Sequence, residues 1–221
     1  MCRLAAFPPG MKKGDALDII HNMKGGNSDG FGSVHVMNGK FIVDKSPEDF
    51  SKLAVEGNNL LSHMPYDGWT VAHVRAVSYG KKCLENTHPF VHGDYALVHN
   101  GTWVNSFWVR NALNWGDTKV KWEGNTDSEV MCWMMNKLGP LELYSYLAAD
   151  HTSAAILSLD LVGNLWAIRT LPTADMELCC FEPGKVTVAS DIKYEHHPVK
   201  PKWVVAKYDP AGKLVNHWLK K

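Results

Sequence analysis

The chain has 221 residues, of which 45% are hydrophobic and 21% are charged, proportions ordinary for a globular protein that buries a sizeable core. Its 23 basic and 23 acidic residues give a formal net charge of zero, so charge offers no reason to expect nucleic acid or an anionic membrane as the main partner. The sequence has neither a basic-then-apolar signal pattern nor an apolar run of about 18 residues, which predicts a cytoplasmic protein without a membrane span.

The cysteines argue against a disulfide framework and against a metal site. Their number is odd and no two have C-x-x-C spacing, so neither paired bridges nor a zinc cluster is indicated. The simplest expectation is a reducing compartment and a protein that needs no metal and no cofactor. The five are Cys2, Cys83, Cys132, Cys179 and Cys180.

The first half of the chain predicts short strands separated by turns. Asn38-Gly39 between two such strands is a strong hairpin signal, and a glycine-rich loop, GGNSDGFG at 25–32, precedes that hairpin. Ser46-Pro47-Glu48-Asp49 is typical of a helix start, and this helix is expected to run to about Leu61. The predicted strands are Cys2–Ala6, Ser33–Met37, Lys40–Val43, Trp69–Val74 and Tyr95–His99.

The second half predicts two helices and then a run of strands. A capping box at Thr126–Glu129 opens a helix that ends near Lys137, and a further helix follows Pro140. Strands at both ends with helices between them predict an α+β fold with mostly antiparallel sheets, and the absence of repeats or linkers predicts a single domain over 1–221. The later strands are expected in TSAAILSLD and LWAIRT, which flank a turn at 161–164, and in ELCCFE, KVTVAS, KWVVAKYD and KLVNHWLKK.

A cysteine stands at the second position of the chain. Removal of Met1 would make Cys2 the first residue, with a thiol and a free α-amine on the same residue. Such a pair can act as nucleophile and general base. An isolated cysteine at this position does not by itself indicate catalysis, so the other motifs must show whether Cys2 is a nucleophile.

Three internal motifs supply groups that could bind a small substrate. Arg75 ends a strand in AHVRAVSYG and could hold a carboxylate, although a lone arginine is most often a surface ion pair. Asn100 and Gly101, in LVHNGTWVN, could form an oxyanion hole, although Asn-Gly alone most often marks a tight turn. Asp127 opens a helix, where it complements the helix dipole, and could also hold an ammonium group.

Each motif is weak alone, and their combination is more specific. A substrate with an α-carboxylate, an α-amine and a distal carbonyl would use all of them, and glutamine has these three groups. The chain resembles the class II glutamine amidotransferases of the N-terminal-nucleophile hydrolase fold, in the branch that begins Met-Cys-Arg. The resemblance rests on six stretches in the family's order: MCRLAAF, DGFG, AHVRAVSYG, NTHPF, LVHNG and NTDSE.

The resemblance implies a fold, a set of roles and a reaction. The fold would be a four-layer αββα sandwich. The reaction would cleave the side-chain amide of L-glutamine through a thioester on the N-terminal cysteine, giving glutamate and giving ammonia to a separate synthetase or ligase. The implied roles are nucleophile for Cys2, carboxylate binding for Arg75 with Ser78, oxyanion hole for Asn100 and Gly101, amine binding for Asp127, and a place near the glutamine pocket for Asn86 and His88.

Two departures keep the substrate open. Ala76, Ser78 and Tyr79 stand where many members of the class have Trp and a Thr-His pair, and the chain begins Cys-Arg rather than Cys-Gly. One alternative is a hydrolase of γ-glutamyl peptides or amides that passes on no ammonia. An alternative of another class is an inactive binding or scaffold protein with the same fold, whose signature would be loss of Cys2, Asn100 or Asp127.

Overall fold

A computed structural model describes residues 2–23, 27–50, 61, 64, 67–78, 80–115, 120–170, 177–182, 185–189 and 202–219, with the backbone alone for 177–182 and 185–189. The helix expected from Ser46 to Leu61 falls mostly outside these residues. Within them, helical geometry begins at Phe50, and the Glu48 N–H donates to the Ser46 hydroxyl at 3.1 Å, as in a helix cap.

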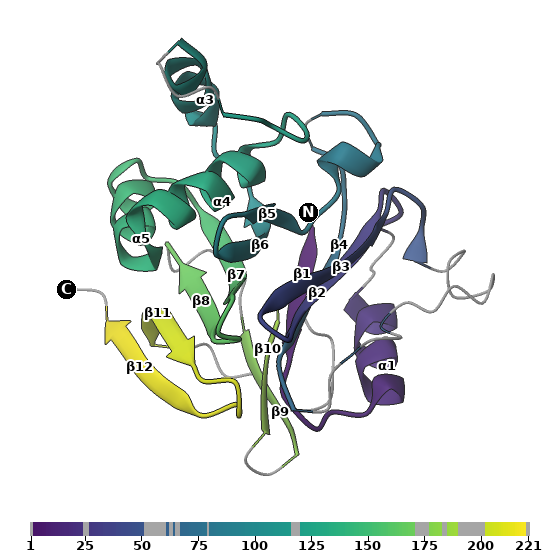
Figure 1. The fold of residues 1–221 in the computed structure, drawn as a ribbon. Coiled ribbons are helices and arrows are strands. Elements are labelled where there is room, and N and C mark those ends of the chain that lie inside the picture. Colours follow the sequence, from purple (N-terminus) through teal and green to yellow (C-terminus); the bar gives the residue numbers. More distant parts are fainter. Residues whose placement is uncertain are drawn as a thin grey trace.

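The strands form two six-stranded antiparallel sheets (Figure 1). The first sheet has the order β3-β2-β4-β1-β10-β9, and the second has the order β12-β11-β8-β7-β6-β5. The first sheet contains β1 (Arg3–Phe7), β2 (Phe31–Met37), β3 (Lys40–Ser46), β4 (Thr70–Val74), β9 (Glu177–Glu182) and β10 (Lys185–Ala189). The second contains β5 (Phe90–His92), β6 (Tyr95–Gly101), β7 (Ala154–Asp160), β8 (Leu165–Arg169), β11 (Trp203–Tyr208) and β12 (Leu214–Leu219).

Helices cover the outer faces of the sheets. Helix α1 (Lys13–Met23) packs on the first sheet, and α4 (Asp127–Leu138) and α5 (Pro140–Ala149) pack on the second (Figure 1). A third apolar core lies between the sheets and includes Leu4 of β1 and Val98 of β6. These four layers confirm the predicted αββα fold. None of the helices in the described part of the chain is long and apolar enough to cross a membrane.

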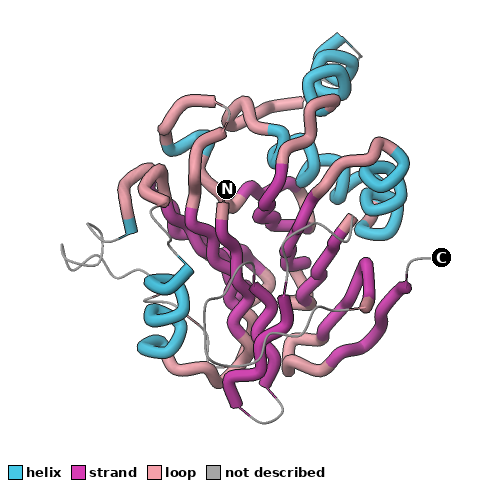
Figure 2. Tube along the Cα trace, turned by 180° about the vertical axis from the view of Figure 1, so that it is seen from behind, coloured by secondary structure: helices cyan, strands magenta, loops and turns pink. Residues whose placement is uncertain are grey.

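Most predicted strands and both later helices are confirmed, with boundaries that shift by a few residues. The hairpin turn at Asn38-Gly39 has positive φ at both residues, 54° and 67°, as a two-residue β-hairpin requires. Four elements in the described part of the chain were not predicted: α1, the short 3-10 helix η1 (Leu84–Asn86), the short strand β5, and helix α3 (Ser106–Trp115). Helix α3 projects from the sandwich and fully buries none of its residues (Figures 1 and 2).

Candidate active site

A cavity of about 370 Å³ brings together residues from both sheets and from the loops that follow them. Six of the eight predicted site residues line it: Cys2, Arg75, Ser78, His88, Gly101 and Asp127. The other two, Asn86 and Asn100, are buried beside it and are not part of its lining. Residues separated by more than a hundred positions in the sequence therefore share one pocket.

Strand alternation explains why the polar residues gather at this end. Successive side chains of a strand point to opposite faces, and Leu4 of β1, Val71 of β4 and Val98 of β6 belong to the core between the sheets. Counting in twos from these positions places Cys2, Arg75 and Asn100 on the same inter-sheet faces. Because β1 and β4 pair antiparallel with Arg3 opposite Val74, Cys2 and Arg75 extend the two strands side by side. The site is thus the polar end of an apolar core.

The thiol of Cys2 is partly buried at the start of β1. Its Sγ donates to the backbone carbonyl of Ala76 at 3.4 Å. Burial raises the pKa of this thiol, and the smaller effects of the Ala76 hydrogen bond and of the Arg75 charge act in the opposite direction. The sulfur is therefore protonated at neutral pH, and a base is needed before it can act as a nucleophile.

The backbone of Arg75 is held by the glycine-rich loop, and its guanidinium donates from Nη1 to the Lys81 carbonyl at 3.1 Å. The Arg75 backbone N–H donates to the Gly30 carbonyl at 2.8 Å, and its carbonyl accepts from the Asp29 N–H at 3.2 Å. The Asp29 carboxylate also accepts from the Val77 N–H at 2.8 Å. Sequence reasoning did not identify Asp29, although the DGFG stretch was among the motifs and its loop was expected to shape the site. The loop fixes the segment that follows β4, and the Lys81 carbonyl accepts from the guanidinium.

Asn100 and Gly101 continue the strand and do not form the tight turn that an Asn-Gly pair alone most often marks. Both lie within β6, opposite Ala155 and Ala154 of β7, so strand pairing overrides the local turn preference. Gly101 has φ 143°, and a Cβ there would lie 2.3 Å from the Ser153 carbonyl oxygen, so only glycine fits. The Gly101 backbone is consequently open to the cavity, and the Asn100 side chain is buried with 5% of its surface exposed.

Asp127 is the first residue of α4, whose N-cap is Thr126. One carboxylate oxygen accepts from the Trp103 N–H at 2.7 Å, and the other accepts from the Ser128 N–H at 2.9 Å. These bonds tie the segment after β6 to the start of α4. The carboxylate lies at the positive end of the helix dipole and on the wall of the cavity.

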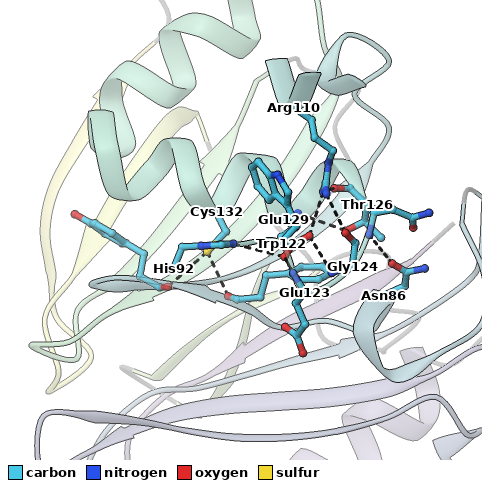
Figure 3. A network of polar contacts seen from close by, with 12 residues as sticks. Asn86, His92, Arg110, Trp122, Glu123, Gly124, Thr126, Glu129 and Cys132 are labelled. Atoms are coloured by element: carbon cyan, nitrogen blue, oxygen red, sulfur yellow. Dashed lines mark hydrogen bonds and ion pairs between the residues drawn. The ribbon is translucent and has the colours of Figure 1, made fainter. Parts of the chain in front are cut away.

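A buried carboxylate behind this wall organises the loop that leads into α4 (Figure 3). Glu129 is fully buried and accepts from the backbone N–H groups of Glu123 and Gly124 and from the Arg110 guanidinium. Arg110 also donates to the carbonyls of Gly124 and Thr126, at 2.9 and 2.8 Å. Burial would raise the pKa of Glu129, and the hydrogen bonds from His92, Glu123 and Arg110 outweigh it and lower that pKa.

The NTHPF stretch lies behind the cavity. The Asn86 side chain accepts from the Asn125 N–H at 2.9 Å and donates to the Lys81 carbonyl at 3.2 Å, so it joins two loops of the site. His88 lines the cavity, and its carbonyl oxygen would be 2.0 Å from a Cβ at position 32, which explains the second glycine of DGFG. Ser78 lies exposed at the rim.

Among the described residues, no group of three or more His, Cys, Asp or Glu side chains is placed to hold a metal ion. The arrangement instead offers a thiol, a guanidinium, a backbone N–H and a carboxylate around one small space. These groups suit acyl transfer on a zwitterionic substrate.

Comparison with known proteins identifies one family. The family model described as "Glutamine amidotransferases class-II" matches residues 21–159, more than half of the chain. This match contains seven of the eight predicted site residues; Cys2 lies before it.

A curated relative supports the same grouping. The probable glutamine–fructose-6-phosphate aminotransferase (isomerizing) of Acanthamoeba polyphaga mimivirus is 28% identical over 158 residues, which are 69% of this chain and 24% of that protein. The chain therefore spans about a quarter of the length of this relative.

Solved structures share the fold. The glutamine phosphoribosylpyrophosphate amidotransferase of B. subtilis superposes with a TM-score of 0.70 at 17% identity, covering 96% of this chain and 48% of that one. A glutamine aminotransferase class-II domain protein of Silicibacter pomeroyi gives a TM-score of 0.64 at 17% identity, covering 96% of both chains.

Proposed function

The chain belongs to the class II glutamine amidotransferase family, and from that premise we propose that it hydrolyses the side-chain amide of L-glutamine through a thioester on Cys2. The observation that supports the proposal is the shared cavity. Its lining includes Cys2, Arg75, Gly101 and Asp127. Arg75 would bind the α-carboxylate, with Ser78 assisting at the rim, and Asp127 would bind the α-ammonium.

The first half of the proposed reaction forms the thioester. With Met1 removed, the α-amine of Cys2 takes the proton from the thiol, whose pKa is raised by burial, and the sulfur attacks the amide carbon. The negative charge that develops on the amide oxygen is stabilised by the Gly101 N–H and the Asn100 side-chain amide, and loss of one such donor typically costs about 3 kcal/mol. The ammonium of Cys2 then gives its proton to the nitrogen as the C–N bond breaks and ammonia leaves.

The second half regenerates the enzyme. The α-amine takes a proton from water, the hydroxide adds to the thioester carbonyl, and the same donors stabilise the second tetrahedral intermediate. The C–S bond breaks, the sulfur recovers its proton, and glutamate leaves. Apart from Asn100, which is buried beside the cavity, every group used in the two halves lines the cavity.

We further propose that a separate synthetase or ligase receives the ammonia. The mimivirus relative is named as an aminotransferase of fructose-6-phosphate, and this chain matches only 24% of that protein. The part of the relative that uses the ammonia could therefore lie in the remaining sequence, which this chain does not match. A mixing experiment tests this part: an acceptor enzyme should use glutamine-derived nitrogen only when this protein is present, and use of free ammonia alone would argue against a dedicated pair.

A second candidate is hydrolysis of γ-glutamyl amides with a larger leaving group. The apolar side chains of Val104 and Phe107 line the cavity and are 80% and 55% exposed, so an apolar leaving group could contact them. The ratio of kcat/KM for a γ-glutamyl anilide to that for glutamine separates the candidates. A ratio well above one that falls in Phe107→Ser favours this second function, and a ratio below one favours glutamine.

The nucleophile is tested by Cys2→Ala, compared with Cys83→Ala as a control at a half-buried cysteine outside the cavity lining. We expect Cys2→Ala to lose at least a thousandfold in kcat while it still binds glutamine, and Cys83→Ala to keep wild-type rates. An N-terminal extension that prevents removal of Met1 should inactivate the enzyme equally. Wild-type turnover in either the Cys2→Ala or the extended protein contradicts the mechanism.

A further inference from the structure

Three buried histidines lie at the base of the cavity, two of them (His88 and His99) in its lining, and the proposed reaction uses none of them. His73 of β4, His88 and His99 of β6 are each no more than 4% exposed. His73 stacks on His88, with ring centroids 3.9 Å apart, and its Nε2 donates to the His99 carbonyl at 3.2 Å. Burial lowers the pKa of all three, so the rings are neutral at neutral pH.

His99 is connected to Asp127 through a hydroxyl. Its Nδ1 lies 3.1 Å from Ser128 Oγ, and this oxygen lies 3.3 Å from Asp127 Oδ1. Position 99 is two residues from Leu97, which packs in the core under α4, so strand alternation directs the imidazole toward that helix. The three side chains therefore form a continuous chain from β6 to the cavity wall.

The directions of these hydrogen bonds follow from the acceptor at one end. An ionised carboxylate only accepts, so the single hydroxyl hydrogen of Ser128 points to Asp127. The Ser128 oxygen must then accept from His99, which fixes the imidazole in the tautomer that carries its proton on Nδ1. With the opposite tautomer, an oxygen lone pair of Ser128 would face the carboxylate at 3.3 Å.

The other ring nitrogen agrees with this tautomer. His99 Nε2 is buried and has no hydrogen-bond partner within the described residues. It lies against Gly101, where an added Cβ would approach it to 2.8 Å. His99 is among the residues that line the cavity, but its Nδ1 is bonded to Ser128 and its Nε2 is buried against Gly101, so the imidazole acts on Asp127 through the Ser128 hydroxyl.

We propose that His99, acting through Ser128, is a positioning residue that orients the Asp127 carboxylate toward the α-ammonium of the substrate. The Ser128 hydroxyl adds a donor to Oδ1, which already accepts from the Ser128 N–H, and so turns the remaining lone pairs of the carboxylate in a defined direction. The inference rests on the proposed function, because it assumes that Asp127 binds an α-amine. It assigns selectivity for α-amino substrates to a residue outside the cavity's reacting groups.

The test compares two ligands that differ only in the α-amine: L-glutamine and its des-amino analogue, 4-carbamoylbutanoate. Calorimetry on Cys2→Ala protein gives both dissociation constants without turnover. Adding His99→Leu should reduce the preference for glutamine about tenfold, the effect of weakening one hydrogen bond to a charged group. Ser128→Ala should reduce it similarly.

His99→Asn is the matched control, because its amide places an N–H donor near the position of Nδ1, and it should restore most of the preference. A purely structural role of His99 predicts equal weakening of both ligands in His99→Leu, and that result, or an unchanged preference, overturns the inference. If the Cys2→Ala protein with His99 intact binds neither ligand, the proposed function itself is contradicted, and the inference with it.

Discussion

The two walls of the cavity are held in different ways. On the wall formed by the first sheet, Arg75 is held by hydrogen bonds to backbone groups: its own N–H and carbonyl pair with the loop at 29–30, and its guanidinium donates to the Lys81 carbonyl. The Asp29 carboxylate adds one bond, to the Val77 N–H. On the wall formed by the second sheet, Asp127 depends on a buried network of side chains centred on Glu129 and Arg110 (Figure 3). Backbone pairing tolerates side-chain replacement, and a buried ionic network does not, so the second wall should be the more sensitive to mutation.

The largest expected effect is on catalysis at the second wall. Asn100→Ala should lower kcat about 100- to 1,000-fold with little change in KM, because an oxyanion donor acts mainly in the transition state. Steady-state glutaminase kinetics measure both constants. Asn105→Ala, at an asparagine outside the cavity lining that bonds to Asp150, is the control. A loss in kcat of less than about fivefold would mean that the Gly101 N–H stabilises the oxyanion without Asn100.

The network behind the second wall should control stability. Glu129→Ala removes the partner of Arg110 and leaves two loop N–H groups without their acceptor, so the free energy of unfolding should fall by about 3 kcal/mol. This loss of stability is at the lower end of the range usual for breaking a buried ion pair, because the Arg110 side chain is 14% exposed and water can reach the guanidinium. Urea denaturation measures the change, with the exposed Glu142→Ala as control. Equal stability of the two variants would contradict the ranking of the walls.

The buried histidines between the walls should make stability depend on pH. Each has a pKa below that of a free imidazole, so the unfolded chain binds more protons as the pH falls below about 6.5, and for His73, whose pKa is about 3, this difference persists to about pH 3. Stability therefore rises with pH and is lost as the pH falls below about 6.5, at up to about 1.4 kcal/mol per pH unit for each histidine. His88→Phe should reduce this slope by about one such increment, and the variant is compared with His217→Asn at an exposed position of β12. An unchanged slope in His88→Phe would mean that His88 is charged in the folded protein.

The smallest effect is expected at the first wall. Asp29→Ala removes one hydrogen bond to the N–H of Val77, which is 37% exposed, so water can replace the carboxylate. The free energy of unfolding should fall by only about 1 kcal/mol. Urea denaturation beside Glu129→Ala gives the comparison directly, and a loss at Asp29 as large as that at Glu129 would erase the distinction between the walls.

The sequence predicts the residues around the cavity better than it predicts how they are held. Cys2, Arg75, Gly101 and Asp127 were identified from motifs and do line one space. The position of Asn100-Gly101 inside β6 could not be predicted locally, because pairing with β7, more than fifty residues away, decides it. The role of Glu129 was expected to be a helix cap, and its contacts with Glu123 and Gly124 depend on how a loop folds back.

The two α-helices that were not predicted, α1 and α3, differ in how deeply they are buried. Helix α1 buries Ala16, Ile19, Ile20 and Met23, whose spacing of three and four residues is a readable helical signal in the sequence. Helix α3 fully buries none of its residues, but Val109, Arg110 and Leu113 are partly buried on one face with the same three- and four-residue spacing, and Val109 packs against the core under α4. Both helices therefore carry a periodic signal in the sequence, and they differ in how deeply the apolar face is buried.

The measurement that tests the central claim most directly is the intact mass of the purified protein before and after incubation with a diazo-ketone analogue of glutamine. The account predicts that Met1 is absent and that one adduct forms, located on Cys2 by peptide mapping. It also predicts that excess glutamine protects against this adduct. A protein that has lost Met1 and forms no adduct, or forms one on Cys83 or Cys132 instead, would contradict an N-terminal nucleophile in a glutamine pocket.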